Sequence, residues 1–312
     1  MYELLILLIA LAGLMIGAEL IIKAALTIAE HYKISHAFIG LTLLTLGTNL
    51  PELVISVTGS VQRLRGIETS GLIIGDSIGS CFGQIGITMG IVGMFGVLTL
   101  TKRELSRDGV MMLASVALLF LAGLDGTLSR TDGLIFIAAY AIYFFLLYRE
   151  EEVHEKFKSA PPLHFMRTIL SISVGFAILI ISSYAVLNNA LYLADMWGIS
   201  QSFIGIVLIG LGTSLPELAL SWSSIRKRAV NLSVFNLIGS NIFDILFTLG
   251  VGSLISSFIV SEDLVRFDIP ALFFFSLLVL LFFRRHMQLK KNEAFVLILL
   301  YVVYIGVKIY SL

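Results

Sequence analysis

Ten apolar runs, each long enough to cross a lipid bilayer as a helix, follow one another along this chain of 312 residues, with charged residues gathered between them. A helix needs about 20 apolar residues to cross roughly 30 Å of hydrocarbon. Hydrophobic residues make up 58% of the chain and charged residues only 13%, a balance that excludes an ordinary soluble domain. We therefore predict an all-α polytopic membrane protein with ten transmembrane helices, over residues 2–29, 35–62, 69–98, 106–124, 130–148, 167–194, 200–225, 230–258, 267–284 and 293–310.

Lys and Arg residues are distributed unevenly between alternate loops, and such residues gather on the cytoplasmic side of membrane proteins. If the N-terminus lies outside, the inner loops hold the clusters near residues 33, 102–107, 149–167, 226–228 and 284–291. The outer side then holds only Arg63, Arg65, Arg130, Arg266 and Lys308. Lys23 alone is expected inside a helix. We therefore expect a cell-membrane protein with both termini extracytoplasmic, and the net charge of zero suggests no nucleic-acid partner.

The two halves of the chain repeat each other. The stretch "ISHAFIGLTLLTLGTNLPELVIS" (34–56) aligns without gaps on "ISQSFIGIVLIGLGTSLPELALS" (199–221), and "DSIGSCFGQIG" (76–86) aligns on "NLIGSNIFDIL" (236–246). Each half contains five predicted helices, so the second half enters the membrane from the opposite side, as in the inverted repeats of transporters. We expect one repeat at 1–149, a polar cytoplasmic linker at 150–166 and the second repeat at 167–312.

Each of the first two matching stretches carries a proline in the middle of a predicted membrane helix. Pro51 has no N–H and clashes with the carbonyl four residues earlier, so the helix is expected to break between Gly47 and Pro51. The same break is expected between Gly212 and Pro216. Freed carbonyls inside a membrane must line a cavity or be buried in protein, and carbonyl oxygens are good ligands for hard cations such as Ca²⁺.

Polar side chains then fall into stripes, because residues four apart share one face of a helix. Each half contributes two stripes, and we expect all of them to converge near the membrane centre. The stripes are Thr48, Glu52 and Ser56; Thr213, Glu217 and Ser221; Asp76, Ser80 and Gln84; and Asn236, Ser240 and Asp244.

Three of these carboxylates, Glu52, Glu217 and Asp244, lie near the middle of predicted helices. A charged side chain at the bilayer centre costs about 3 kcal/mol or more, and no basic residue is expected beside them. Bound cations or protons are therefore expected to neutralise them. Oxygen ligands without a thiolate or an intramembrane histidine favour Ca²⁺ over Zn²⁺ or copper. Asp76 lies nearer a helix end, and a purely structural role stays open for it.

These motifs resemble those of the cation/calcium exchanger superfamily, whose two repeats carry G-T-S-x-P-E and G-S-x-x-x-[ND]. The stretches "GTSLPE" (212–217) and "GSNIFD" (239–244) match fully, and "GTNLPE" (47–52) differs at one position. The resemblance implies that Ca²⁺ is held by Glu52 and Glu217 and by the carbonyls of Thr48 and Thr213.

Members of the sodium/calcium type also place Na⁺ around the same glutamates. The resemblance carries this counter-ion role to Asn49 and Ser214, Ser80 and Ser240, Gln84 and Asp244, and the carbonyls of Thr45 and Gly210. Asp76 and Asn236 complete the expected cavity. This chain departs from the pattern at three positions: Asn49 replaces a hydroxyl residue, Gln84 replaces Asn, and Asp76 stands where Asn is usual.

These departures affect the ion that travels against Ca²⁺. Proton-coupled members load the same two glutamates with H⁺, although the branch with a G-N-x-x-E motif differs from the T-S-x-P-E retained here. Because the altered positions correspond to Na⁺ ligands and not to Ca²⁺ ligands, we favour Ca²⁺/H⁺ exchange. Na⁺/Ca²⁺ exchange, with or without K⁺, stays the alternative.

The expected mechanism is alternating access by a monomer, with inorganic cations and the lipid bilayer as partners and no cofactor. The first and sixth helices are expected to slide and expose the site to each side in turn, an expectation that rests on the resemblance. A Ca²⁺-permeable channel is the rival from another class. An enzyme is not expected, because the chain has neither an H-E-x-x-H nor a G-x-S-x-G motif.

Overall fold

The computed structural model describes residues 2–31, 45–150, 165–226 and 231–310, and helices dominate all four segments. Among these residues, nine helices are long and apolar enough to cross a membrane. The prediction of an all-helical membrane protein is thereby confirmed. The first part of the predicted second span, 35–44, and nearly all of the predicted linker 150–166 lie outside the described residues.

Most predicted spans agree with observed helices to within a few residues, and several spans consist of two or more shorter helices joined end to end. The α-helices are α1 (Tyr2–His31), α3 (Thr45–Thr48), α4 (Leu50–Leu64), α5 (Ser70–Phe82), α6 (Met89–Phe95), α7 (Lys102–Glu104), α8 (Val110–Gly123), α9 (Arg130–Glu150), α10 (Phe165–Trp197), α11 (Gln201–Ile204), α12 (Gly210–Thr213), α13 (Leu215–Arg226), α14 (Asn231–Ile242), α15 (Leu249–Ile255), α16 (Ile269–His286) and α17 (Lys291–Tyr310).

Short π-helical segments join several of these helices, namely η2 (Gly83–Thr88), η3 (Leu105–Gly109), η4 (Gly205–Ile209), η5 (Phe243–Thr248) and η6 (Leu264–Asp268). The sequence did not predict them. The segment η5 begins 160 residues after η2, so the same interruption follows α5 in the first half and α14 in the second. Such π turns inside helices are frequent at functional sites.

Two very short antiparallel ribbons connect the halves. Strand β1 (Leu98–Thr99) pairs with β4 (Gln288–Leu289), and β2 (Thr127–Leu128) pairs with β3 (Phe258–Ile259). Each ribbon therefore joins a loop of the first half to a loop of the second. Two-residue strands carry no recognisable sequence pattern, and these were not predicted either.

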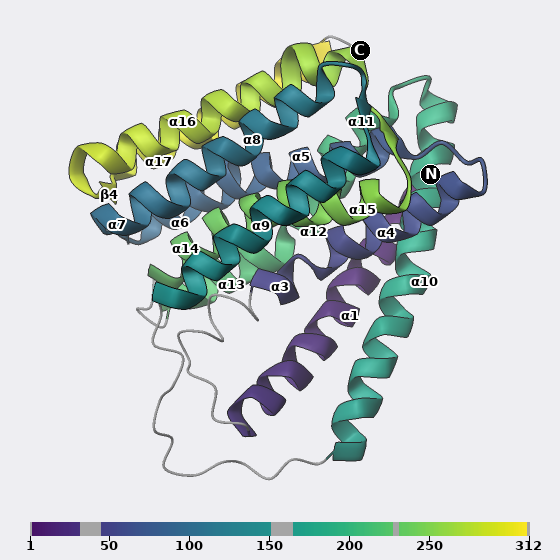
Figure 1. Ribbon diagram of the computed structural model, residues 1–312, viewed down its shortest axis with the longest axis horizontal. Coiled ribbons are helices and arrows are strands. Elements are labelled where there is room, and N and C mark those ends of the chain that lie inside the picture. The colour runs from purple at the N-terminus through teal and green to yellow at the C-terminus, as the bar shows by residue number, and fades with distance from the viewer. Residues whose placement is uncertain (1, 32–44, 151–164, 227–230, 311–312) are drawn as a thin grey trace.

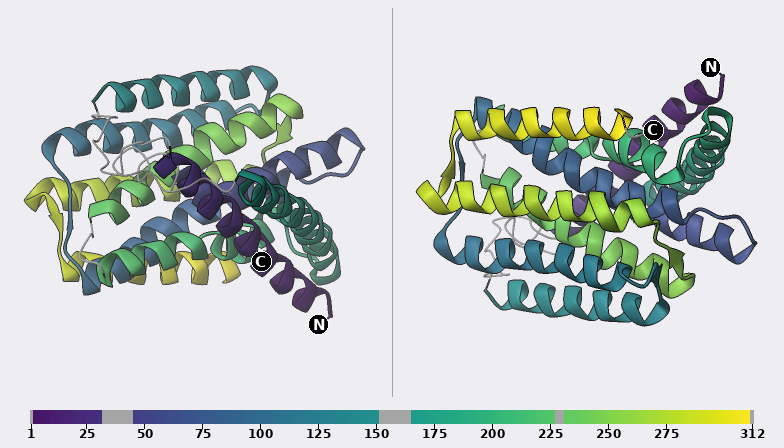
Figure 2. Two further views of the ribbon diagram at one scale, coloured as in Figure 1. Left: turned by 90° about the horizontal axis from the view of Figure 1, so that it is seen from below. Right: turned by 90° about the horizontal axis from the view of Figure 1, so that it is seen from above.

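Helices α1 and α10 lie side by side and extend away from the remaining helices (Figures 1 and 2). Among the described residues, they form the main part of a second apolar core, to which other elements contribute the buried Ile55, Leu72, Ile204 and Ile209 and the partly buried Leu50, Val54, Ile199 and Leu208. The larger apolar core is built mainly from α5, α6, α8 and α14–α17. At the crossing of α1 with α10, a Cβ atom on Gly17 would lie 2.9 Å from the Gly175 carbonyl oxygen, so both glycines allow the close approach.

A second close crossing places α5 against η4 and α12. A Cβ atom on Gly79 would lie 2.6 Å from the Ile206 Cα, and a Cβ atom on Gly210 would lie 2.6 Å from the Ser80 backbone nitrogen. Real Cβ atoms do not approach other atoms so closely. The absence of side chains at these glycines therefore brings the polar faces of α5 and α12 together.

We expect Gly79→Ala to destabilise the protein by about 1–3 kcal/mol, because the added methyl group must push α5 away from Ile206. Gly306→Ala in α17 is the matched control, since a Cβ atom there meets nothing within 4 Å. Thermal unfolding of the two variants in detergent measures the difference. Equal midpoints would contradict the close crossing.

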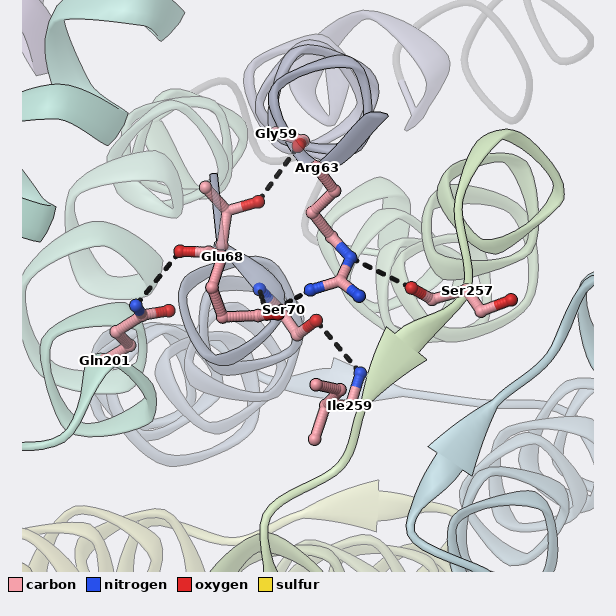
Figure 3. A network of polar contacts seen from close by, with 8 residues as sticks. Gly59, Arg63, Glu68, Ser70, Gln201, Ser257 and Ile259 are labelled. Carbon is pink, nitrogen blue, oxygen red and sulfur yellow. Dashed lines mark hydrogen bonds and ion pairs between the residues drawn. The ribbon is translucent and has the colours of Figure 1, made fainter. Parts of the chain in front are cut away.

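The turn between α4 and α5 is tied to distant parts of the chain by a polar network (Figure 3). Arg63 forms an ion pair with Glu68 and donates from Nε to the Ser257 carbonyl at 2.9 Å. The Ser70 hydroxyl accepts from the Ile259 N–H at 2.9 Å, and the Gln201 amide donates to the Glu68 carbonyl at 3.0 Å. This network links the helix that carries Glu52 to β3 and to α11.

Glu68 makes this network dependent on pH. Its partial burial acts to raise its pKa, but hydrogen bonds from Ser70 and the Arg63 guanidinium outweigh that effect and lower the pKa. A carboxyl group whose pKa is lowered by folding stabilises the fold above its unfolded pKa, and this contribution is lost as the pH falls through the folded value. We expect the protection factors of the amides in the turn 65–70, that is, the factors by which folding slows their exchange relative to an unstructured chain at the same pH, to fall below about pH 4.

Glu68→Gln should show the fast exchange at neutral pH as well, whereas Glu262→Gln should leave the turn 65–70 unchanged. Glu262 forms an ion pair with the exposed Arg266, four residues later in the chain. Protection factors in this turn that do not change with pH in the wild-type protein would contradict the role given to Glu68.

Two further acids are buried with basic partners. Asp268 is fully buried, accepts from the Lys308 ammonium at 2.5 Å and accepts from the Tyr304 hydroxyl at 2.7 Å. Asp108 pairs in the same way with Arg107 at 2.6 Å and with the Tyr143 hydroxyl at 3.1 Å. The expectation that Lys23 alone lies inside a helix was therefore wrong, because Lys308 is buried in α17 by its pairing with Asp268.

Candidate functional site

The two proline-containing motifs interrupt their helices as predicted. Helix α3 ends at Thr48 and α4 begins at Leu50, while α12 ends at Thr213 and α13 begins at Leu215. Asn49 and Ser214 occupy the interruptions. Pro51 falls in the first turn of α4, where its missing N–H leaves no intrahelical bond unmade. The glutamate that follows each proline is thereby held at the start of a new helix.

The four acids of the motifs are buried together. Glu52, Glu217 and Asp244 have no exposed surface, and Asp76 is 1% exposed. The negative charges of Glu217, Asp244 and Asp76 all act on Glu52. In the described part of the chain, none of the ion pairs involves these four acids. The basic residues buried elsewhere therefore do not neutralise them.

Several oxygens of these acids have no hydrogen-bond partner. They are Glu52 Oε2, Glu217 Oε1 and Oε2, and Asp244 Oδ1. A buried carboxylate oxygen without a partner costs several kcal/mol. Protein groups satisfy almost all such atoms in native structures, so an exception requires an explanation. A cation or a proton at these oxygens provides one.

Side chains alone do not complete a metal centre here. Within the four described segments, no group of three or more His, Cys, Asp and Glu side chains lies close enough together to hold a metal ion. A cation between two carboxylates therefore needs further oxygen ligands, such as backbone carbonyls or hydroxyls.

The structure brings the predicted counter-ion residues of the two halves into contact. Ser80 and Ser214 hydroxyls lie 3.0 Å apart, and the Asn49 amide donates to the Ser240 hydroxyl at 2.9 Å. The Ser80 hydroxyl also donates to Glu52 Oε1 at 3.3 Å. The first two contacts each join a helix interruption of one half to the G-S motif of the other, whereas the contact between Ser80 and Glu52 lies within the first half.

The carbonyls of Thr45 and Gly210 already accept hydrogen bonds from side chains. The Asn49 amide donates to Thr45 O at 2.5 Å, and the Ser214 hydroxyl donates to Gly210 O at 2.7 Å. The Thr48 hydroxyl lies beside Glu217 but donates to Thr45 O at 3.5 Å. These contacts compete with any cation for the Thr45 and Gly210 carbonyls.

Two further pairs of predicted residues form hydrogen bonds between the two halves of the chain. The Thr213 hydroxyl donates to Asp76 Oδ1 at 3.0 Å, and the Thr45 hydroxyl donates to Asn236 Oδ1 at 3.3 Å. Asp76 thus has a partner in the other half, which agrees with the structural role left open for it.

Gln84 and Asp244 are in direct contact. Asn241, which the sequence analysis did not identify, forms a hydrogen bond with Gln84. Gln84 donates to Asp244 Oδ2 at 3.2 Å and accepts from the Asn241 amide at 2.7 Å. Asn241 is 1% exposed. It is the third letter of "GSNIFD", and a buried amide one helical turn before Asp244 was a signal that could have identified it.

Comparison with known proteins gives a consistent result. The family described as sodium/calcium exchanger protein matches residues 2–149 and 168–310. Sodium/calcium exchanger MaX1 of Methanosarcina acetivorans is 29% identical over 98% of each chain. Putative antiporter CaxA of Alkalimonas amylolytica is 29% identical over 80% of this chain and 79% of its own length. A solved structure of the sodium-calcium exchanger NCX_Mj, soaked with Na⁺ and Sr²⁺, matches with a TM-score of 0.68 and 26% identity over 97% of each chain.

Proposed function

Because the chain belongs to the sodium/calcium exchanger protein family, we propose that it is a secondary active antiporter that exchanges Ca²⁺ for H⁺ across the cell membrane. The family consists of exchangers and not of enzymes. The observation that carries the proposal is the set of unpartnered carboxylate oxygens on Glu52 and Glu217, both fully buried. Ca²⁺ binds between these two side chains and takes further oxygens from the Thr48 and Thr213 carbonyls.

Exchange is coupled because the empty site cannot cross the membrane. Two ionised glutamates with three of their four oxygens unpartnered in a low-dielectric interior are too costly to form during the transition. Either Ca²⁺ or the counter-ion must therefore occupy the site whenever it moves between the two sides.

The donors around the site favour protons as the counter-ion. Amide N–H groups of Asn49 and Gln84 point at the Ser240 and Ser80 hydroxyls, and an N–H group cannot bind a metal cation. Na⁺ is the second candidate, and the names of MaX1 and NCX_Mj, both sodium/calcium exchangers, favour it.

The architecture that we propose has ten transmembrane helices in two inverted repeats, at 1–149 and 167–312, with a cytoplasmic linker at 150–166 and both termini extracytoplasmic. The recurrence of the π segments η2 and η5 supports this symmetry, as do the reciprocal contacts between halves. The extensive packing of α1 against α10 supports their movement as a pair. One chain contains both glutamates, so the protein functions as a monomer.

A flux measurement tests antiport against the rival of a Ca²⁺ channel. Purified protein in proteoliposomes should take up ⁴⁵Ca²⁺ only when a counter-ion is present inside. Uptake down a Ca²⁺ gradient alone, with the membrane potential clamped and no counter-ion gradient, would indicate a channel and overturn the proposal.

A further inference from the structure

A chain of three side chains crosses from α14 to η2 and back to η5. The Asn241 amide nitrogen donates to the Leu237 carbonyl at 2.8 Å and to Gln84 Oε1 at 2.7 Å. The Gln84 amide nitrogen donates to the Ser80 hydroxyl at 3.0 Å and to Asp244 Oδ2 at 3.2 Å. All of these side chains are buried. The chain therefore begins at a backbone carbonyl and ends on a carboxylate of the site.

The Leu237 carbonyl determines the direction of the hydrogen bonds in this series of side chains. A backbone carbonyl only accepts, so the group of Asn241 that faces Leu237 must be the amide nitrogen. The same nitrogen faces Gln84, so the Gln84 group on that side must be its oxygen. The Gln84 nitrogen is then turned toward Ser80 and Asp244. Asn241, which needs an acceptor, and the Asp244 carboxylate, which needs a donor, thus both require Gln84 to present its N–H groups to the site.

The N–H groups of Gln84 prevent a cation from binding between Ser80 and Asp244. A small monovalent cation needs several oxygens directed at it, but the Ser80 hydroxyl and Asp244 Oδ2 instead accept hydrogen bonds from Gln84, which leaves only Asp244 Oδ1 unpartnered. Without Asn241, the Gln84 amide could rotate and present its oxygen, which would join those of Ser80 and Asp244 as a third ligand. The orientation of the Gln84 amide therefore determines whether the space between Ser80 and Asp244 can bind a cation.

We propose that Asn241 is a positioning residue that locks the Gln84 amide as a donor, and that this lock excludes Na⁺ from the space between Ser80 and Asp244. The inference rests on the proposed Ca²⁺ antiport and names a cause of its ion selectivity. It leaves the Ca²⁺ position unaffected, because the unpartnered oxygens of Glu52 and Glu217 lie outside the lock.

The other half of the chain provides a matched control. Cys81 lies 160 residues before Asn241, as Gln84 does before Asp244, so it occupies the corresponding position on α5. Cys81 is buried, and its thiol lies 3.8 Å from the Asn241 carbonyl oxygen, away from the Gln84 amide. Cys81→Ala therefore changes the packing at the same depth without releasing the lock.

Equilibrium binding of ⁴⁵Ca²⁺ to the purified full chain, titrated with NaCl against choline chloride, tests the inference. In Asn241→Leu and in Gln84→Ala, the Na⁺ concentration that displaces half of the Ca²⁺ should fall roughly tenfold or more, as expected for the loss of one hydrogen bond to a charged group. Cys81→Ala should match the wild-type protein. Ca²⁺ affinity without Na⁺ should change less than about threefold in Asn241→Leu and Cys81→Ala, since a merely structural defect would weaken Ca²⁺ binding itself.

Asn241→Asp keeps the shape of the side chain but offers acceptor oxygens to Gln84, so it should increase Na⁺ competition to the same extent. It keeps the test available if Asn241→Leu does not fold. Ca²⁺ binding that persists with the same Na⁺ competition in wild type, Asn241→Asp and Gln84→Ala would overturn the lock alone. Wild-type protein that binds no Ca²⁺ would instead contradict the proposed function, and the inference with it.

Discussion

Glu52→Gln and Glu217→Gln are each expected to lower counter-ion-driven ⁴⁵Ca²⁺ uptake in proteoliposomes by at least about a hundredfold. Both side chains are fully buried, and three of their four carboxylate oxygens have no hydrogen-bond partner. Glutamine keeps the shape but removes one negative charge from a place with little solvent to replace it. The loss of about 3 kcal/mol of binding free energy per charge is a modest estimate for such a site.

The effect should be specific to these two acids. Glu262→Gln removes an acid from a solvent-exposed ion pair and should leave uptake unchanged. Thermal stability of the two site variants should equal or exceed that of the wild-type protein, because each removes an uncompensated buried charge. Exchange retained in both variants would defeat the assignment of the Ca²⁺ site.

Lys308→Met is expected to destabilise the protein by about 3–5 kcal/mol, the cost of leaving one partner of a buried ion pair without the other. Lys308 lies 2.5 Å from Asp268, which has no exposed surface and also accepts from Tyr304. Without the ammonium group, the Asp268 carboxylate is left with the tyrosine hydroxyl as its remaining partner among these contacts. The thermal midpoint of the purified protein in detergent measures the loss.

A second substitution separates this effect from the loss of packing. Asp268→Asn combined with Lys308→Met removes both charges and should recover most of the stability, because the Asn oxygen can still accept from Tyr304. Arg266→Gln breaks an exposed pair one turn earlier and should change little, as surface ion pairs contribute little. A double variant as unstable as Lys308→Met would show that the charge is not the cause.

The sequence was sufficient to predict an all-helical membrane protein and the two helix interruptions. Long apolar runs predict membrane helices directly, and Pro51 and Pro216 indicated the interruptions that the structure has at Asn49 and Ser214. The repeat of the two motifs indicated which acids belong together. These features depend only on residue type and spacing, which a single sequence contains.

Other features depend on how helices meet, and spacing does not contain that information. The contact between Ser80 and Ser214 requires the crossing of α5 with α12 at the glycines Gly79 and Gly210. A π turn such as η2 changes the hydrogen-bond pattern over six residues without altering the apolar pattern. In the sequence, Lys308 looks like an exposed basic residue at a helix end. Its buried partner, Asp268, lies 40 residues earlier in the chain.

The most direct test compares ⁴⁵Ca²⁺ uptake into proteoliposomes under an imposed pH gradient, under an imposed Na⁺ gradient and under no gradient. If Ca²⁺ and protons alternate on Glu52 and Glu217, the pH gradient will drive uptake, and Glu52→Gln will abolish it. Uptake that only the Na⁺ gradient drives would contradict proton coupling while leaving antiport intact. Uptake of equal rate under all three conditions would contradict antiport itself.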